Sequence, residues 1–271
     1  MHKFTALKDI PYGNHERQKL DIFMPESPNC TSGIILFIHG GGWVQGDKAG
    51  HHHDTDFFSN AGYISATINY RYVDENTTVF DELDDITAAL KTIKAECEKY
   101  GFNIEKLLLS GGSAGSHLAL LYAYTRKEQA PLTPVAACVY CPPVDCSKPD
   151  FLLGISGEFE DWKYDVLSKC CGIEINRENL LEPQQQEALK KISPQDYISE
   201  NCIPTAIFHG SLDELIPFSH IQKFIASLTE KGIKNDLLIY ESSGHALDKD
   251  PETALQTKDI ISKYAEMCFL R

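Results

Sequence analysis

The sequence predicts an α/β fold, with a doubly wound, mainly parallel sheet and helices on both faces. Short apolar runs recur along the chain, amphipathic stretches lie between them, and two glycine-rich turns directly follow apolar runs. Short apolar runs are typical of buried parallel strands, and their alternation with helical patterns is typical of βαβ units. The length of 271 residues suits one domain spanning 1–271 with a modest insertion.

Six apolar runs are expected to form the parallel strands. The stretch from Glu82 to Tyr100 carries apolar residues at helical spacing, so we expect an amphipathic helix there. Leu20–Phe23, near the start, is expected to form an antiparallel edge strand. The six runs are Ile34–Ile38, Tyr63–Asn69, Leu107–Ser110, Ala136–Tyr140, Thr205–Phe208 and Leu237–Tyr240.

The most informative segment is the glycine-rich turn Gly111-Gly112-Ser113-Ala114-Gly115. It follows an apolar run and leads into Ser116-His117-Leu118-Ala119, an order that predicts strand, sharp turn and helix. A G-x-S-x-G turn lifts the serine hydroxyl out at the top of the sheet, and small flanking residues permit the strained corner. The turn therefore predicts that Ser113 is a nucleophile.

The second glycine-rich turn is His39-Gly40-Gly41-Gly42-Trp43, which follows Ile34–Ile38. Successive glycines leave backbone N–H groups unshielded and permit unusual dihedral angles. Acyl transfer passes through an intermediate with a negative oxygen, and fixed N–H donors lower that barrier. We expect the amides of Gly41, Gly42 and Ala114 to form this oxyanion hole.

Taken together, the two turns resemble those of the α/β-hydrolase esterases, specifically the branch with small carboxylesterases, acetyl-xylan-type esterases, hormone-sensitive-lipase relatives and kynurenine formamidases. The resemblance extends from about Asp21 to the C-terminus and is weakest between Cys146 and Gln195. Hormone-sensitive-lipase relatives usually carry an aspartate where this chain has Gly112, which favours the acetyl-esterase and formamidase side. The resemblance implies the α/β-hydrolase fold, with a cap insertion expected over 146–195.

A serine nucleophile needs a base, and in this fold an acid and then a histidine follow it along the chain. His245 is the favoured base because it lies in a turn-rich loop after the last predicted strand, at the edge where parallel sheets collect their active sites. Three other histidines follow the serine. We expect His117 to pack or cap on its helix, His209 to support its loop, and His220 to be exposed.

The resemblance places the acid at Asp213, in the loop after Thr205–Phe208. Two other carboxylates stay open as alternatives. Glu214 is adjacent but is expected to face elsewhere, and Asp145 follows the preceding strand, from which some members of the fold take their acid.

The predicted insertion holds a group of apolar residues among charged ones. These residues either line an acyl or alcohol pocket or pack the insertion onto the body of the domain. Trp162 in this segment and Trp43 beside the glycines are the candidate substrate contacts, although Trp43 is expected mainly to anchor its loop. The apolar residues are Phe151, Leu152, Leu153, Phe159, Trp162, Tyr164 and Leu167.

Composition argues against several other classes. The net charge of −14 without a basic cluster argues against a nucleic-acid partner. No apolar run is long enough to span a membrane, and the N-terminal residues do not fit a signal peptide, so a cytoplasmic location with nine reduced cysteines is expected. Neither His51-His52-His53-Asp54 nor the pair Cys138 and Cys141 is expected to bind a metal.

The sequence therefore predicts a cofactor-free serine hydrolase acting on small-molecule carboxylic esters with a short acyl group, acetylated sugars among them. An arylformamidase using the same residues is the nearest alternative, because the chemistry differs only in the leaving group. A peptidase-type activity shares the order of triad residues, but the chain lacks a substrate-sorting domain. A non-catalytic binding protein would be expected to lack a site residue, and none is missing. By analogy with relatives, a homodimer is allowed.

Overall fold

The computed structural model describes residues 4–30, 32–148, 151 and 158–270. Leu152, Leu153 and the side chain of Phe159, which the sequence placed in the insertion, lie outside the described part. No helix in the described part combines the length and the apolar character that crossing a bilayer requires.

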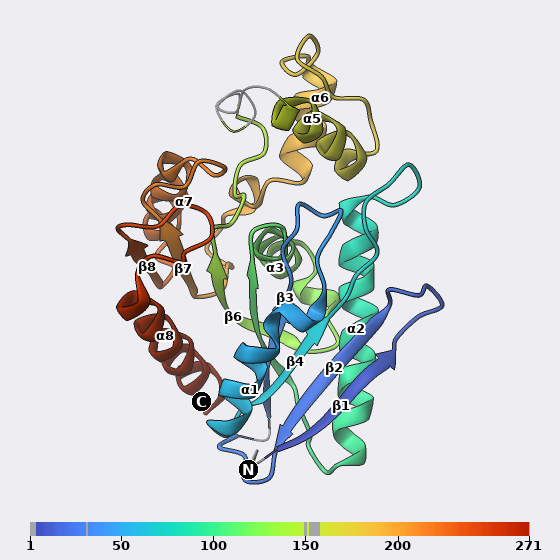
Figure 1. Cartoon of the computed structure of the whole chain (residues 1–271), viewed down its shortest axis with the longest axis vertical. Coiled ribbons are helices and arrows are strands. Elements are labelled where there is room, and N and C mark those ends of the chain that lie inside the picture. Colours follow the sequence, from blue (N-terminus) through green and yellow to red (C-terminus); the bar gives the residue numbers. More distant parts are fainter. Residues whose placement is uncertain (1–3, 31, 149–150, 152–157, 271) are drawn as a thin grey trace.

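The described strands form one eight-stranded sheet, ordered β1-β2-β4-β3-β5-β6-β7-β8 (Figure 1). β2 pairs antiparallel with both β1 and β4, and all later pairs are parallel. The strands are β1 (Phe4–Pro11), β2 (Lys19–Pro25), β3 (Gly33–Ile38), β4 (Ile64–Ile68), β5 (Lys106–Gly112), β6 (Thr133–Tyr140), β7 (Thr205–Gly210) and β8 (Asn235–Tyr240). The predicted doubly wound, mainly parallel sheet is confirmed, and each of the six predicted runs is a strand.

The prediction for Leu20–Phe23 was right about direction and wrong about position. This run lies in β2, which is antiparallel, but β1 covers its outer side and is the true edge strand. The residues of β1 are half-buried or exposed, because only one strand flanks it. Its sequence therefore lacks the continuous apolar run by which the other strands were recognised.

Helices cover both faces of the sheet because strand side chains alternate in direction. In β3, Ile34, Leu36 and Ile38 join a core with α2, α3 and α7, whereas Ile35 and Phe37 join a second core with α1 and α8. The helices are α1 (His52–Asn60), α2 (Val79–Lys99), α3 (Ala114–Thr125), α5 (Glu158–Cys171), α6 (Pro183–Lys191), α7 (Phe218–Glu230) and α8 (Pro251–Phe269), with short 3₁₀ turns η1 (Lys48–His51), η2 (Lys127–Gln129) and η3 (Pro194–Tyr197).

The helix predicted from Glu82 to Tyr100 is α2, which begins three residues earlier at Val79. Thr78 and Asp81 form a capping box there, each bonding the backbone of the other, and this satisfies amides that the first turn would otherwise leave free.

Two helices of the segment 146–195 lie beyond the carboxyl ends of the parallel strands. Figure 1 shows α5 and α6 together at one end of the molecule, above α3 and beyond the end of β6. Parallel sheets of this kind bind ligands at this edge. The predicted insertion therefore lies on the side of the sheet where the glycine-rich turns emerge.

Candidate active site

Ser113 occupies a strained corner between β5 and α3. Its φ of 51° and ψ of −118° lie in a region that non-glycine residues rarely adopt. The corner also presses against the end of β3, because a Cβ added to Gly111 or Gly115 would stand 2.5 or 2.0 Å from the Ile38 carbonyl oxygen. The flanking glycines are thus required by close backbone approach, and the turn holds Ser113 at the end of the sheet.

The three predicted triad residues form one hydrogen-bonded chain. Ser113 Oγ lies 2.9 Å from His245 Nε2, and His245 Nδ1 lies 2.8 Å from Asp213 Oδ2. The other carboxylate oxygen, Oδ1, accepts hydrogen bonds from the amides of Leu215 (2.8 Å) and Ile216 (2.9 Å). The three side chains come from the turns that follow β5, β7 and β8, so the parallel sheet brings them together.

The surroundings of Asp213 favour its ionised form. Burial is the largest single influence and acts to raise the pKa of Asp213, but the hydrogen bond and charge of His245 together with the Ile216 amide outweigh it, and the pKa lies below its usual value. An ionised Asp213 accepts a hydrogen bond from His245 Nδ1–H, which leaves Nε2 free to accept from the Ser113 hydroxyl. This is the tautomer that a general base requires.

The two alternative acids lie elsewhere. Glu214 is exposed. Asp145 accepts hydrogen bonds from the amide and hydroxyl of Ser147 and lies 3.8 Å from Lys148 Nζ. His245 Nδ1 pairs with Asp213 and with neither of these carboxylates.

The second glycine-rich turn presents unpaired amides. Gly41, Gly42 and Trp43 have φ values of 119°, 58° and 64°, which turn successive peptide units away from a regular hydrogen-bonding pattern. In the described part of the chain, no acceptor pairs with the amides of Gly41, Gly42 or Ala114. Gly41 and Gly42 line the same cavity as Ser113. These amides have the freedom that an oxyanion hole needs.

A group of side chains that the sequence did not single out holds this turn. Arg17 Nη2 lies 3.2 Å from His39 Nε2, and the His39 ring stacks on Tyr70 at 4.3 Å. His39 Nδ1 donates to the Gly40 carbonyl at 2.7 Å, so His39 is neutral and accepts from Arg17 at Nε2. Burial lowers the pKa of His39 to about 4. Arg17 also lies over the Tyr72 ring and donates to the Tyr70 carbonyl. It thus connects the glycine-rich turn to the segment that contains Tyr70 and Tyr72.

His117 links the oxyanion turn to the end of the insertion. Trp43 Nε1 donates to His117 Nδ1 at 3.1 Å, and His117 Nε2 lies 2.6 Å from the Ile192 carbonyl oxygen, to which it donates. Trp43 is 5% exposed and lines the cavity beside Ser113. It therefore anchors its loop through the indole N–H and also forms part of the cavity wall.

The prediction that His220 is exposed was wrong. His220 is 2% exposed, and its ring lies 6.5 Å from that of Phe151. His220, Phe224 and Leu228 recur at every fourth position, so they share the face of α7 that packs on the domain. His209, by contrast, supports its loop as expected, with Nε2 3.2 Å from the Ile216 carbonyl oxygen.

Two cavities meet at Ser113 and His245. The first measures about 590 Å³ and lies under α5, with Phe151, Trp162 and Lys163 in its wall. Trp162 rests on the oxyanion turn, because a Cβ added to Gly42 would stand 2.6 Å from its ring.

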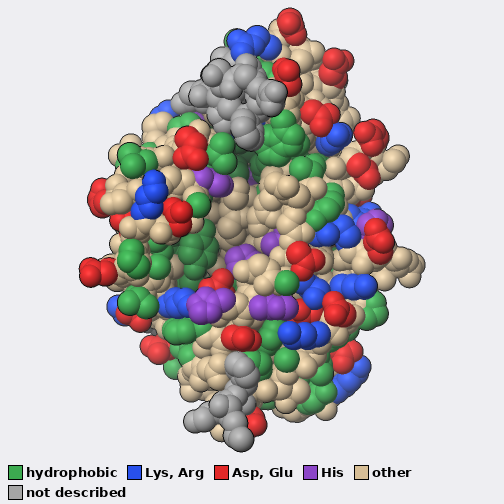
Figure 2. All heavy atoms as spheres, in the orientation of Figure 1, with side chains coloured by type: hydrophobic (Ala, Val, Ile, Leu, Met, Phe, Trp, Pro, Cys, Tyr) green, Lys and Arg blue, Asp and Glu red, His purple; other side chains and the backbone are tan. Residues whose placement is uncertain are grey.

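The second cavity measures about 740 Å³ and has a mixed lining, with polar residues such as His51, His53 and Lys258 beside apolar ones such as Leu247 and Leu255. Figure 2 shows histidine side chains gathered across the middle of this face. Ser113 thus lies between one mainly apolar space and one space of mixed character.

The histidine-rich segment 51–54 is divided among separate partners. His51 Nδ1 lies 3.0 Å from Asp54, His52 Nε2 2.7 Å from Asp21, and His53 Nε2 3.0 Å from Lys258 Nζ. These side chains are therefore held by separate hydrogen bonds.

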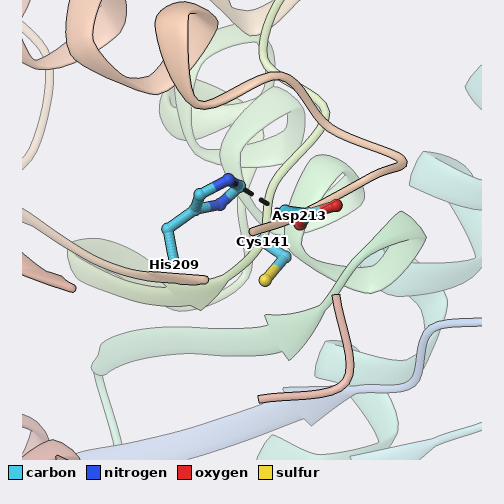
Figure 3. A group of neighbouring side chains, drawn as sticks. All are labelled: Cys141, His209 and Asp213. Carbon is cyan, nitrogen blue, oxygen red and sulfur yellow. Dashed lines mark ion pairs between the residues drawn. The ribbon is translucent and has the colours of Figure 1, made fainter. Parts of the chain in front are cut away.

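One cluster in the described part has the spacing of metal ligands, namely Cys141, His209 and Asp213 (Figure 3). His209 Nε2 lies 3.7 Å from Asp213 Oδ2, and burial raises the pKa of the Cys141 thiol, which donates to the His245 carbonyl. Both Asp213 oxygens are already engaged by His245 and by backbone amides. We assign Cys141 and His209 to positioning Asp213 and the His245 loop.

The chain matches known esterases along most of its length. A model of the BD-FAE family matches residues 20–228. A probable isoprenylcysteine alpha-carbonyl methylesterase ICME of Oryza sativa subsp. japonica is 27% identical over 269 residues, covering 89% of this chain and 58% of that protein. The probable carboxylic ester hydrolase LipM of Mycobacterium tuberculosis is 28% identical over 236 residues, covering 82% and 51%. The chain thus spans about half the length of these relatives.

Solved structures share the fold. A truncated carbohydrate esterase from gut microbiota superimposes with a TM-score of 0.78 at 18% identity, covering 97% of this chain and 98% of that one. Esterase B of Lactobacillus rhamnosis superimposes with a TM-score of 0.74 at 18% identity, covering 98% and 88%. With the serine turn, the glycine turn and the sheet order on the same scaffold, this chain belongs to the BD-FAE family and has the α/β-hydrolase fold of the esterases.

Proposed function

We propose that this protein is a serine hydrolase that cleaves carboxylic esters through an acyl-enzyme. The observation that carries the proposal is the chain from Ser113 through His245 to Asp213, with distances of 2.9 and 2.8 Å, beside three unpaired amides. The relatives' names support it, since they include carboxylic ester hydrolases and methylesterases.

In the first half-reaction, Ser113 Oγ attacks the ester carbonyl as its proton passes to His245 Nε2. The carbonyl oxygen becomes an anion, and the amides of Gly41, Gly42 and Ala114 donate to it. Each such donor contributes about 3–4 kcal/mol in comparable enzymes. Collapse of the intermediate breaks the bond to the alcohol, which takes the proton from His245 and leaves.

In the second half-reaction, water attacks the acyl-enzyme and gives a proton to His245. Asp213 holds the imidazole and stabilises its charged form, without taking the proton itself. The new intermediate collapses to release the carboxylic acid, and the proton returns to Ser113.

The acyl group is proposed to be short, by resemblance to acetyl esterases. Acetylated sugars are included because a carbohydrate esterase shares the fold. In the second cavity, His51 and His53 offer polar groups to an alcohol arm that carries hydroxyl groups.

The test is hydrolysis of 4-nitrophenyl esters from acetate to octanoate, alongside an acetylated xylose and N-formylkynurenine. Ser113→Ala is the matched control, because it removes one oxygen and keeps the fold. We expect turnover to favour acetate and to fall at least about 1,000-fold in Ser113→Ala. A preference for the formyl amide would instead make the protein an arylformamidase. Activity that survives in Ser113→Ala would refute the mechanism.

A further inference from the structure

Lys163 is a buried cation in the wall of the candidate substrate cavity. It lies on α5, is 7% exposed, and lines the 590 Å³ cavity together with Ser113 and His245. Apart from Gln45, the remaining side chains of that cavity are apolar or aromatic. A single ammonium in such a wall sets the charge preference of whatever occupies the space.

The ammonium makes backbone contacts and no ion pair within the described part of the chain. Lys163 Nζ donates to the carbonyls of Phe151 and Leu215, the latter at 3.4 Å, and lies 4.1 Å from the centre of the Phe151 ring. Two of its three N–H groups are thus engaged, and no described carboxylate lies within 4.0 Å of Nζ. One donor and a full positive charge remain.

Lys48, a second buried lysine, provides a comparison because carboxylates contact its ammonium. Lys48 is 6% exposed, and its ammonium lies 2.7 Å from Asp21 and 3.0 Å from Asp9. Burial acts to lower the pKa of Lys48, but these carboxylates outweigh it and raise the pKa above its usual value. For Lys163, burial dominates and lowers the pKa to about 8. The contrast marks Lys163 as a buried ammonium that no described carboxylate contacts directly, since Asp213 acts on it only from beyond contact distance.

Burying a charge without an opposite charge beside it is costly. The charge loses its contacts with water, and the protein interior supplies few contacts in their place. A link between α5 and the Leu215 carbonyl alone would not require a charge. The cost is recovered if a ligand supplies the counter-charge, since a charge-assisted hydrogen bond in a dry cavity is among the stronger polar contacts.

We propose that Lys163 determines specificity by binding a carboxylate on the arm of the ester that occupies the 590 Å³ cavity. The natural substrate is accordingly an ester that carries a free carboxylate on its acyl or alcohol side. This inference rests on the proposed esterase function and narrows its substrate class.

The test compares matched esters that differ in one charge. On the acyl side, the pair is mono(4-nitrophenyl) adipate and its methyl ester. On the alcohol side, the pair is 4-acetoxybenzoate and its methyl ester. The readout is the ratio of kcat/KM for the anionic ester to that for the neutral one, in wild type, Lys163→Met and Lys169→Met. Lys169 lies on the same helix, pairs with Asp165 and is outside the cavity, so it controls for the loss of one positive charge from α5.

We expect Lys163→Met to lower the anionic-to-neutral ratio of one pair at least about tenfold, and Lys169→Met to leave both ratios unchanged. If Lys163 serves only as a structural tie, both members of each pair will lose the same factor and the ratios will stay constant, which overturns the inference. A wild type that hydrolyses the neutral esters in a Ser113-dependent way, but shows unchanged ratios in Lys163→Met, rejects the inference and keeps the proposed function. A wild type inactive on all four esters rejects the proposed function instead.

A second measurement needs no variant and therefore survives a folding defect in Lys163→Met. In wild type, the ratio for the responsive pair should fall as the pH rises through about 8, because Lys163 loses its charge there. The ionisable groups that act on Lys163 are Asp213 and Cys146, and His245 shares the cavity. Asp213 stays ionised and the buried Cys146 thiol stays neutral over this range, and the neutral ester corrects for His245. A ratio that is constant from pH 6.5 to 9.5 overturns the inference.

Discussion

Acid should weaken this protein through His117, a histidine outside the triad. His117 is fully buried, accepts the Trp43 indole N–H at Nδ1 and donates from Nε2 to the Ile192 carbonyl. Protonation would place a hydrogen on Nδ1, directly opposite the indole hydrogen. Burial lowers the pKa of His117 to about 4, from the usual 6.5.

The size of the effect follows from proton linkage. Between pH 6.5 and 4 the unfolded chain binds a proton at His117 and the folded chain does not, so folding stability falls as the pH falls through this window. At pH 5 the loss is about 2 kcal/mol, and below pH 4 it approaches about 3 kcal/mol. For a domain whose total stability is about 5–15 kcal/mol, this is a large fraction.

Urea unfolding followed by tryptophan fluorescence from pH 7.5 to 5 measures this loss, in wild type and His117→Gln. Glutamine cannot titrate and keeps a polar group at the site. We expect the variant to be less stable at pH 7, because it loses well-formed buried hydrogen bonds. The stability gap should then shrink by about 2 kcal/mol at pH 5. His39, whose pKa burial lowers to about 4, titrates equally in both proteins. A gap that stays constant across this range would refute the reasoning.

Two further substitutions test the site geometry. Asp213→Asn should lower kcat about 10⁴-fold with little change in melting temperature. Two backbone amides hold the oxygen at Oδ1, so the new NH₂ group faces His245 Nδ1 and imposes the wrong tautomer. A loss of kcat of less than tenfold would contradict this. Gly115→Ala should lower the free energy of unfolding by about 1–3 kcal/mol or more, because its Cβ would lie 2.0 Å from the Ile38 carbonyl oxygen. Urea unfolding measures this loss. Gly112→Ala is the matched control and should leave stability nearly unchanged, since nothing lies within 4 Å of a Cβ there.

Local sequence patterns predicted the parts of this protein that local physics determines. Strands buried on both faces read as apolar runs, and the two glycine turns could be recognised because close backbone approach and positive φ angles leave few other choices of residue. Ser113 and His245 followed from their positions in turns after predicted strands, and Asp213 followed from the resemblance to the α/β-hydrolase esterases. Strand boundaries differ from the predicted ones by at most three residues.

The features that were missed depend on contacts between distant residues. Arg17 reaches the Tyr70 carbonyl 53 positions away, and nothing near Arg17 in the sequence indicates that it supports the oxyanion turn. The burial of His220 required counting along α7 to see that Phe224 and Leu228 share its face. Lys163 is buried and no described carboxylate contacts its ammonium, which only a three-dimensional arrangement can reveal.

The order of the strands gives the candidate nucleophile and base unequal protection against local unfolding. Ser113 follows β5, which is flanked by β3 and β6, whereas His245 follows β8, which pairs only with β7 and is half-exposed along most of its length. Edge elements with few buried contacts open at lower free energy than central ones. Opening of β8 would withdraw the base while the serine turn stays closed. Hydrolytic activity would then depend on β8 remaining paired with β7. On denaturation, activity would be lost before the global structure.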